Sequence, residues 1–399
     1  MSDASRNRAV AVVVGQDINA LGVLRSLAEG GVTSFAFIAD RSSPVGWSRH
    51  GTKVTCGALA GPELIAALRA FADRRPGGSE PPVLFLTEER GVETVCDHLP
   101  ELTRRYRYTA PDAAVLRALL RKNEFQRLAE RTGAPIPRSL HLTSATLPEA
   151  ARDLSFPVIL KPTARDYEYA RRFAKAYRCA NLGELAGWVE RIMPVCHDLM
   201  VQEWIEGDDS DIYFCLTYCA PAPAERVAFV GRKLRSWPPR IGGTASCVAV
   251  PEFHDELSRR TFDFFDSVGF VGIGSMEFKR DRRDGDFYMV EPTVGRTDFQ
   301  QEVATVNGVN IPLRAFDAEL GLPAEAARYA DPAVVWRDAQ SVDQARRREA
   351  AAGIDLPRAP TVDALFRWSD PLPAVHARAR PLLSRMRGLA RRFGVAARN

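Results

Sequence analysis

Two apolar segments joined by an acidic, glycine-containing turn constrain the fold of this chain more than any other feature. Residues 272–279 and 287–291 each have the composition of a buried strand, so the pattern predicts an antiparallel hairpin. With the apex at Asp284, Glu277 and Glu291 face each other across the ladder. Opposed Cβ atoms there lie about 5 Å apart, and like charges repel. Two carboxylates so placed need solvent around them or a cation between them.

A hard divalent cation is the interpretation that we favour for this pair. Magnesium takes oxygen ligands and usually uses one or two protein carboxylates together with substrate phosphates. The alternative is a solvent-exposed hairpin with another register, in which the charges are ordinary. Both glutamates lie deep in apolar strands and Arg296 follows them, which favours the metal.

Composition limits the class of protein. A length of 399 residues allows two or three domains, and a net charge of +4 is too small to indicate nucleic acid. The longest apolar runs are strand-sized, which predicts no transmembrane segment, and no secretory stretch follows the N-terminus. Seven scattered cysteines without a Cys-x-x-Cys pair argue against a disulfide framework or a zinc site. These features predict a cytoplasmic protein.

The first hundred residues alternate strands with helices, which predicts a parallel sheet in an α/β domain. The turn after the first strand lacks the close-spaced glycines of a dinucleotide fold, so an NAD-dependent oxidoreductase is disfavoured. The expected strands are residues 9–14, 34–38 and 83–87, and the expected helices are residues 20–29 and 62–73.

The pattern changes after residue 111 to a mixed α+β pair of lobes, and after residue 312 to an arginine-rich helical region. The expected helices are residues 112–132, 146–154, 182–191 and 251–268. The expected strands before the hairpin are residues 139–142, 158–161, 199–205, 212–219 and 226–233.

Lysine is rare in this chain, because only six of its 54 basic residues are lysines. Lys161 ends an apolar strand, where an ammonium group can meet a phosphate beside a low-dielectric wall. The alternative is a side chain that reaches back to solvent. Lys122, at the start of an amphipathic run, carries no signal by itself. Residues 199–209 form a strand that enters an acidic turn, which suits either an adenine-binding edge or an ordinary solvated loop.

Taken together, these motifs resemble the ATP-grasp superfamily over about half of the chain. The matching pieces are Lys122, the strand that ends at Lys161, residues 201–207, and Glu277 followed by Glu291. The N-terminal domain, with residues 48–50 after its second strand, looks like the leading domain of such proteins. Residues 231–244 and 369–373 further resemble a branch of predicted carboligases, to which D-aspartate ligase-like enzymes are related. The implied fold is an N-terminal parallel α/β domain, a two-lobed ATP-grasp fold and a helical C-terminal extension.

The resemblance also implies roles for individual residues, with ATP and Mg²⁺ as cofactors and Mn²⁺ as an alternative cation. For ATP, the phosphates would be bound by Lys122 and Lys161, the adenine by the edge formed by Gln202, Glu203, Trp204 and Ile205, and the ribose by Asp209, with Glu206 as the alternative. The metal ligands would be Glu277, Glu291 and Thr293. The catalytic residues would be Arg296, Lys233 and Arg235. Thr293 stands where the family usually has asparagine. The phosphate-covering segment, residues 163–177, has no glycine, but it offers Arg165, Arg171, Arg172 and Lys175.

The implied reaction joins a small-molecule carboxylate to an amine through an acyl phosphate, with release of ADP and phosphate. One alternative is an ATP-grasp kinase of small molecules, and another is a nucleotide-binding regulatory protein without turnover. Lys233, Arg235 and Arg240 are expected on a loop beside a hinge at residues 242–243. They suit an anionic substrate or an ordinary basic surface equally.

The expected domains are an N-terminal α/β domain (1–112), a first ATP-grasp lobe (113–200), a second lobe with the metal hairpin (201–315) and a helical basic extension (316–399). A homodimer without nucleic acid is the expected assembly. The basic segment at residues 374–399 is expected to be a solvated helix packed by one face, with an anionic membrane as the alternative partner.

Overall fold

The computed structural model of the chain describes residues 9–75, 80–143, 147–163, 167–323, 327–348 and 359–379. The chain divides into two compact units. Unit 1 contains residues 1–107 and 361–399, and unit 2 contains residues 108–360. The division into four domains made from the sequence stays a prediction.

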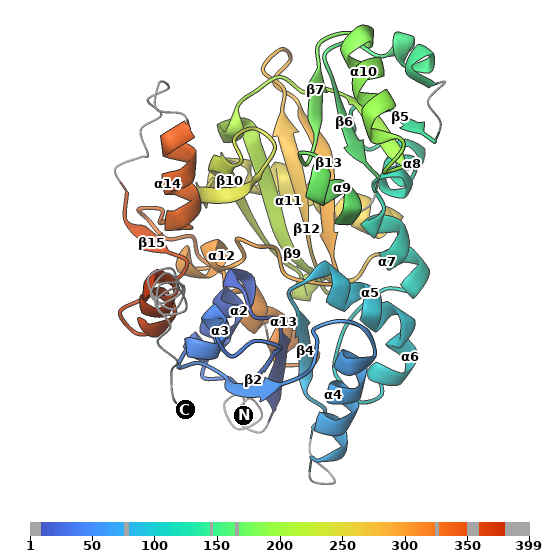
Figure 1. Ribbon diagram of the computed structural model, residues 1–399. Helices are drawn as coiled ribbons and strands as arrows, with labels where there is room; N and C mark the ends of the chain where they lie inside the picture. The colour runs from blue at the N-terminus through green and yellow to red at the C-terminus, as the bar shows by residue number, and fades with distance from the viewer. Residues whose placement is uncertain are drawn as a thin grey trace, which may run out of the picture. The chain divides into compact units, whose positions relative to one another are not determined.

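Unit 1 is built on a four-stranded sheet of order β3-β2-β1-β4 (Figure 1). The sheet is parallel, as predicted, and it contains one strand, β3, that was not expected from the sequence. In strand β1 the four residues Ala11–Val14 are all buried, the pattern of a parallel strand covered on both faces. Its strands are β1 (Val10–Val14), β2 (Thr33–Ile38), β3 (Thr52–Thr55) and β4 (Val83–Leu86). Its helices are α2 (Ile18–Glu29), α3 (Pro44–Trp47), α4 (Gly61–Asp73), α5 (Glu89–Asp97) and α6 (Leu99–Leu102).

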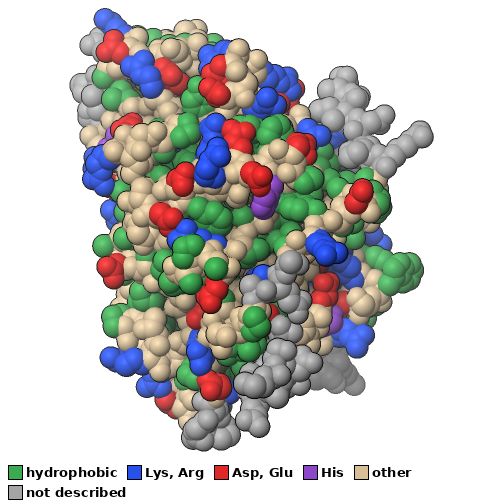
Figure 2. All heavy atoms as spheres, turned by 180° about the vertical axis from the view of Figure 1, so that it is seen from behind, with side chains coloured by type: hydrophobic (Ala, Val, Ile, Leu, Met, Phe, Trp, Pro, Cys, Tyr) green, Lys and Arg blue, Asp and Glu red, His purple; other side chains and the backbone are tan. Residues whose placement is uncertain are grey.

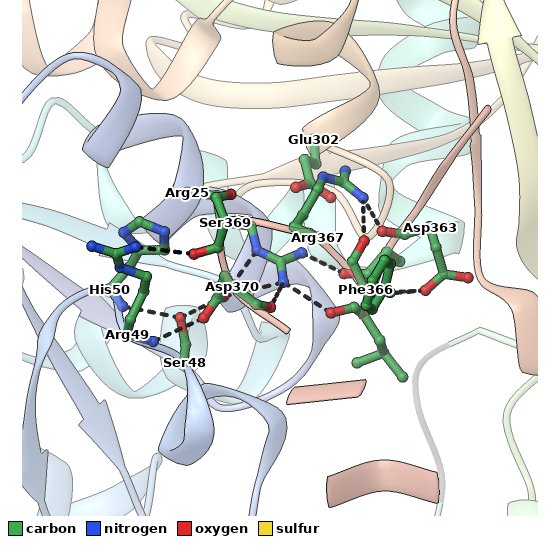
Figure 3. Close-up of polar contacts among 12 residues, drawn as sticks. Arg25, Ser48, Arg49, His50, Glu302, Asp363, Phe366, Arg367, Ser369 and Asp370 are labelled. Atoms are coloured by element: carbon green, nitrogen blue, oxygen red, sulfur yellow. Dashed lines mark hydrogen bonds and ion pairs between the residues drawn. The ribbon is translucent and has the colours of Figure 1, made fainter. Parts of the chain in front are cut away.

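The C-terminal part of unit 1, residues 361–379, is fixed to this α/β layer by a buried ion pair. Asp370 is 1 % exposed and accepts hydrogen bonds from Arg25 Nε (3.2 Å), Ser48 Oγ (2.8 Å) and the backbone amide of Arg49 (2.9 Å). Arg25 also donates to the carbonyl oxygen of Ala364. Figure 3 shows the Asp370 carboxylate between these three donors. Burial alone would raise the pKa of Asp370, but the donors outweigh it and hold the pKa below its ordinary value.

The first sheet of unit 2 is antiparallel and has the order β5-β8-β6-β7. Leu185, Val189 and Ile192 lie on one face of α10 and pack against Val158 and Val201 of this sheet. The strands are β5 (Ser139–Leu142), β6 (Val158–Pro162), β7 (Tyr177–Cys179) and β8 (Leu199–Glu203). The helices are α7 (Ala113–Leu120), α8 (Lys122–Thr132), α9 (Tyr167–Arg172) and α10 (Leu182–Ile192), with the 3₁₀ helix η1 (Leu147–Asp153).

The single helix expected over residues 112–132 is wrong, because the chain breaks at Arg121. That residue has an extended conformation (φ −101°, ψ 119°) and separates α7 from α8. The backbone amide of Lys122 then donates to the carbonyl oxygen of Thr163, 2.9 Å away in the loop after β6. The break therefore places Lys122 at the beginning of a helix and ties it to the end of the strand that carries Lys161.

The second sheet of unit 2 contains strands in the order β13-β12-β9-β10-β11-β14, all antiparallel, and α11 packs against β9 and β10 (Figure 1). The strands are β9 (Ile212–Cys219), β10 (Val227–Trp237), β11 (Gly243–Ala249), β12 (Gly272–Arg280), β13 (Phe287–Val294) and β14 (Val335–Arg337). The helices are α11 (His254–Ser267), α12 (Glu302–Val306), α13 (Ile311–Glu319) and α14 (Ala339–Arg348), with the 3₁₀ helices η2 (Asp209–Asp211), η3 (Pro223–Glu225) and η4 (Pro251–Phe253).

Two further expectations from the sequence are corrected here. Lys233 and Arg235 lie inside β10, where they are 3 % and 5 % exposed, so they belong neither to a mobile loop nor to a basic surface. The region after residue 312 is not purely helical, since it contains β14 and, in unit 1, β15 (Thr361–Asp363). Residues 380–399, which include most of the predicted basic helix, lie outside the described residues.

The charge distribution on the surface and the apolar character of the helices are relevant to binding of nucleic acid and membrane. On the face drawn in Figure 2, basic and acidic side chains are interspersed rather than gathered into one basic field. Over the described ranges, no helix combines the length and the apolar character that crossing a bilayer requires.

The buried ion pair yields a stability prediction. We expect Asp370→Asn to lower the free energy of unfolding of unit 1 by about 3 kcal/mol, because it leaves the Arg25 charge buried without a counter-charge. The matched control is Asp73→Asn, which removes the partner of Arg105 at a site where the aspartate is 62 % exposed, and it should cost less than about 1 kcal/mol. Urea unfolding measures both, and equal midpoints for the two variants would contradict the role of Asp370.

Candidate functional site

The hairpin of β12 and β13 has the register that the sequence predicts. Glu277 pairs directly with Glu291, and Ser275 pairs with Thr293 on the same face. The register shifts by one residue just beyond this pair, so that Val290 forms a bulge. Both carboxylates are partly accessible, with side-chain exposures of 26 % for Glu277 and 39 % for Glu291.

Each of these glutamates holds a lysine from a different part of unit 2. Lys122 Nζ, at the start of α8, lies 2.9 Å from Glu291 Oε1. Lys233 Nζ, on β10, lies 2.6 Å from Glu277 Oε2, although β9 separates the two strands. The like charges of the two carboxylates are therefore neutralised by ammonium groups on both sides of the pair. The two lysines thus supply the positive charge that two opposed carboxylates on a hairpin require.

Lys161 extends the same group of charges. Its Nζ donates to Gln202 Oε1 (2.9 Å), and Gln202 Nε2 donates to Gln126 Oε1 (3.2 Å). Burial and the neighbouring Lys122 ammonium lower the pKa of Lys161 to about 8, while Glu291 opposes them. Lys161 is therefore a cation that a polyanion can stabilise further.

The pKa values of the other members show how strongly the group is coupled. Burial raises the pKa of Glu291, but Lys122, Lys175 and Lys161 outweigh it, so the pKa lies well below its ordinary range. Burial lowers the pKa of Lys233, but Glu277 more than offsets this and the pKa ends above its ordinary value. The Glu291 carboxylate and the Lys233 ammonium group therefore stay charged at neutral pH.

The strand that carries Gln202 leads into the predicted adenine edge. The backbone amides of Glu203 and Trp204 donate to the carbonyl oxygens of Arg138 and Pro157. The Glu203 carboxylate accepts from the backbone amide of Ser155 (2.8 Å), away from the lysines. What this edge can offer a ligand is therefore its carbonyl groups and the following residue, Ile205.

Trp204 and the acidic turn after it are held by cations. Lys279 Nζ lies 4.2 Å from the centre of the Trp204 ring, a cation–π contact. Arg282 of the hairpin turn pairs with Asp208 (2.9 Å) and Asp211 (2.7 Å). The turn is thus fastened to the tip of the same hairpin that carries the two glutamates.

Asp209 has a structural environment that the sequence did not indicate. It is 7 % exposed, and its two oxygens accept from the backbone amides of Ser236 (2.7 Å) and Arg240 (2.8 Å). It therefore fixes the connection between β10 and β11. Glu206, which is 41 % exposed and 3.5 Å from Arg178, is the more accessible carboxylate of this segment.

Beyond β13 the chain adds Arg296 and a residue that sequence reasoning missed. Arg296 donates to the carbonyl oxygen of Thr297 (3.0 Å), and its buried Nε has no hydrogen-bond partner among the described residues. Asp298 accepts from Ser275 Oγ (2.9 Å) and interacts electrostatically with Lys233. The signal available was an aspartate two residues after Arg296, together with a serine two residues before Glu277.

Two observations concern the side chains that could bind a metal ion or cover the phosphates. Within the described ranges, no group of three or more His, Cys, Asp or Glu side chains could hold a metal ion by itself. The two opposed glutamates and the Thr293 hydroxyl nevertheless fit a cation that takes its other ligands from phosphates and water. Of the predicted phosphate-covering segment, Arg165 lies outside the described residues, and Arg171 and Arg172 pair with Glu168.

Solved structures similar to this chain define its fold. One is N5-carboxyaminoimidazole ribonucleotide synthetase in complex with ADP (TM-score 0.63, 13 % identity), which covers 81 % of this chain and 79 % of that chain. Another is the biotin carboxylase domain dimer of 2-oxoglutarate carboxylase from Hydrogenobacter thermophilus, in complex with MgADP, ADP and bicarbonate (TM-score 0.61, 16 % identity), which covers 80 % of this chain and 71 % of that chain. The chain has the ATP-grasp fold, and the predicted fold class is confirmed.

The chain is also similar in sequence to a ligase. The chain is 24 % identical over 326 residues to D-aspartate ligase of Enterococcus faecium (strain Aus0004), a match that covers 78 % of this chain and 76 % of the relative. No family model matches the sequence. The predicted resemblance to ATP-grasp proteins, and to D-aspartate ligase-like enzymes among them, is confirmed.

The site geometry predicts opposite pKa shifts for two of its lysines. With the lysines ¹³C-methylated, we expect an NMR titration to show Lys161 near pH 8 and Lys233 above the ordinary lysine range. The signal of Lys161 is assigned by its loss in Lys161→Arg. Titration of Lys161 at an ordinary lysine pKa would mean that its environment is not the buried, cation-rich one described.

Proposed function

We propose that this chain is an ATP- and Mg²⁺-dependent ligase that activates a carboxylate as an acyl phosphate and couples it to an amine. The observation that carries the proposal is the register-paired Glu277 and Glu291, each bound to a lysine, on one face of a hairpin in an ATP-grasp fold. The similarity to D-aspartate ligase supports carboxylate–amine chemistry.

The proposed metal site consists of Glu277, Glu291 and Thr293. Two opposed carboxylates and one hydroxyl supply oxygen ligands from adjacent strands, which suits Mg²⁺ and, as a second choice, Mn²⁺. When bound, the cation would neutralise charge on the β- and γ-phosphates during transfer. Thr293 contributes a neutral ligand or holds a water molecule, so the two glutamates carry the metal affinity.

Lys122, Lys161 and Lys175 are proposed to bind the phosphates of ATP. All three interact electrostatically with Glu291, and Lys161 approaches from the half-buried end of β6. Three ammonium groups around one carboxylate leave a positive excess, which a triphosphate would balance. Entry of ATP with its cation would exchange the lysine–glutamate pairs for lysine–phosphate and metal–glutamate pairs, and the net negative charge of the ATP–cation complex would offset the positive excess.

The nucleoside is proposed to bind along residues 202–209. Gln202 orients Lys161, and the backbone of Glu203, Trp204 and Ile205 faces the adenine. Asp209 stays the predicted ribose contact through the lone pairs that its two backbone hydrogen bonds leave available. Because Asp209 also holds the β10–β11 connection, we extend the proposal to Glu206 as a second ribose acceptor.

Arg296, Lys233 and Arg235 are proposed to serve the carboxylate substrate. Its oxygen attacks the γ-phosphorus in line, the bond to ADP breaks, and an acyl phosphate forms. The amine then attacks the acyl carbon, loses a proton, and phosphate leaves as the amide bond forms. Positive side chains preorganised around the transferring group stabilise its charge, which is the main contribution a protein makes to this chemistry.

A small-molecule kinase remains the second candidate, and the observation behind it is that the same phosphate and metal residues would serve transfer without a coupling step. A nucleotide-binding protein without turnover is the third, motivated by Thr293 at the asparagine position. The three differ in what accumulates: an amide with ADP and phosphate, a stable phosphorylated product without amine, or bound ATP only.

The proposal for the assembly and the cellular compartment is less specific than the one for the reaction. We propose a protein that acts on small molecules in a reducing compartment such as the cytoplasm, supported by seven free cysteines, all of them buried. A homodimer is the proposed assembly; the biotin carboxylase domain among the similar structures is described as a dimer.

The reaction is tested by screening carboxylates with amines, D-aspartate among them, for release of ADP. We expect ADP and phosphate only when both substrates are present, and Glu291→Gln should lower kcat at least about a hundredfold, because metal charge stabilisation is worth several kcal/mol. Glu256→Gln, on α11, is the matched control. AMP and pyrophosphate as products, or unchanged activity in Glu291→Gln, would refute the proposal.

The pKa of Lys161 gives a pH dependence. Below about pH 8 the ammonium is present and can bind phosphate, and above it the neutral amine cannot. We expect kcat/KM for ATP, which reports the free enzyme, to fall above about pH 8 by up to roughly tenfold per pH unit. Lys161→Arg stays charged throughout and should remove that fall. Identical profiles for the two proteins would exclude Lys161 as the titrating group.

A further inference from the structure

Asp298 is an acidic side chain of unit 2 to which the proposed ligase chemistry gives no role. It follows β13, in the segment that leads to α12, and it is half-buried. Its Oδ2 accepts hydrogen bonds from Ser275 Oγ (2.9 Å) and Gln300 Nε2 (3.2 Å), and its Oδ1 accepts from the backbone amide of Phe299 (2.8 Å). A carboxylate has about four acceptor positions, so these three bonds leave room for a further donor.

The bond to Ser275 places Asp298 beside the proposed metal site. Ser275 and Glu277 are two residues apart in β12, so their side chains point to the same face of the sheet, and Ser275 is the cross-strand partner of Thr293. Lys233 connects the two acidic groups, because its ammonium group binds Glu277 at 2.6 Å and also interacts electrostatically with Asp298. Asp298 therefore lies on the face of the sheet where the acyl phosphate is proposed to form.

The negative charge of Asp298 is balanced differently from that of the two glutamates. Glu277 and Glu291 each form an ion pair with a lysine, whereas over the described ranges no lysine or arginine lies within ion-pair distance of Asp298. Its three hydrogen-bond donors are neutral, and the ammonium group of Lys233 already pairs with Glu277. A half-buried carboxylate without a counter-charge is unfavourable, so a cationic ligand would stabilise it. An amine substrate in its ammonium form is such a ligand.

The residues on either side of Asp298 carry donors that folding leaves unused. Arg296 Nε and Gln301 Nε2 are buried and have no hydrogen-bond partner among the described residues, and Gln301 is 1 % exposed. A buried donor without a partner is unfavourable, and a ligand that accepts from it would remove the penalty. A backbone hydrogen bond of 3.0 Å from the Gln301 amide to the Asp298 carbonyl oxygen closes this turn. One short segment thus offers an acceptor for a cation and donors for acyl oxygens.

We propose that Asp298 binds the ammonium group of the amine substrate and removes a proton from it before the attack on the acyl phosphate. This inference rests on the proposed function and adds to it the residue that activates the nucleophile. It also defines the class of that nucleophile as a basic amine that enters the site as an ammonium ion. Water and alcohols carry no positive charge and would leave the Asp298 carboxylate without a counter-charge.

The protons and electrons of this step balance without another reactant. The ammonium ion transfers one proton to a carboxylate oxygen of Asp298, and the lone pair of the neutral nitrogen then attacks the acyl carbon. The bond from that carbon to the phosphate oxygen breaks, and its electron pair stays on the phosphate. A second proton passes from the nitrogen to the phosphate, which leaves as hydrogen phosphate. Asp298 releases its proton to water, so the carboxylate is restored for the next turnover.

Hydroxylamine separates this role from activation of the carboxylate, because it is uncharged at neutral pH and attacks an acyl phosphate without a base. The wild type is given ATP, Mg²⁺, hydroxylamine and each carboxylate of the screen, D-aspartate among them, and the hydroxamate formed is measured. The carboxylate that gives the most hydroxamate is then coupled to the amines of the screen. We expect Asp298→Asn to keep hydroxamate formation and to lower kcat/KM for the amine at least about a hundredfold.

Two further variants complete this test. Ser275→Ala removes a hydrogen bond that orients Asp298, so it should lower kcat/KM for the amine roughly tenfold and leave hydroxamate formation in place. Asp263→Asn is the matched control, because Asp263 is exposed on α11, and it should change neither reaction. Asparagine keeps the size of the Asp298 side chain and an oxygen that accepts from the Phe299 amide, so the turn is retained.

The two proposals fail in distinguishable ways. A wild type that forms no hydroxamate with any carboxylate would refute the proposed function, and the role of Asp298 with it. Hydroxamate formation together with an equal kcat/KM for the amine in Asp298→Asn and the wild type would overturn the role of Asp298 alone. Loss of both reactions in Asp298→Asn would also overturn it, because Asp298 would then serve the activation of the carboxylate or bind an ammonium group of the carboxylate substrate.

Discussion

The pairing of two glutamates across adjacent strands is the constraint on which the rest of unit 2 depends. Glu277 and Glu291 repel each other at the distance that the register imposes, so each must be neutralised. The fold does this with Lys122 from the start of α8 and Lys233 from a strand two positions away. The first sheet of unit 2, through Lys161, and the second, through Lys233, thus contribute to one group of charges. In the proposed function, a bound metal ion would pair with the glutamates and the ATP phosphates would pair with the lysines.

This group of charges explains where the few lysines of the chain lie. Four of the six lysines, Lys122, Lys161, Lys175 and Lys233, interact electrostatically with the two glutamates. Lysine presents a compact charge on a flexible stem whose pKa shifts on burial, whereas arginine presents a broad planar fork that stays charged. The other two also serve as point cations. Lys53 donates to three carbonyl oxygens of one turn, and Lys279 lies over the Trp204 ring.

Local patterns in the sequence were sufficient for the hairpin register, because turn position and strand alternation determine which residues face each other. They were not sufficient where distant parts of the chain decide. Apolar spacing runs through Arg121 without interruption, and the helix breaks there where the Lys122 amide meets Thr163, forty-one residues further along. The sequence predicted Asp209 as a ribose contact, or else as part of a solvated acidic loop. Asp209 is instead buried, and its carboxylate accepts hydrogen bonds from the backbone amides of Ser236 and Arg240. Partners so far away leave no local signal.

The same argument explains why residues 369–373 stood out in the sequence without revealing their role. Asp370 accepts a hydrogen bond from Arg25, which is 345 residues away in the sequence, and the pair is buried in unit 1. No local sequence pattern indicates a partner at that separation. A buried ion pair contributes little net stability to a domain, because the free energy of desolvating the two charges offsets much of their attraction. Its advantage is a fixed geometry, and what it fixes here is the segment that projects Trp368 into solvent.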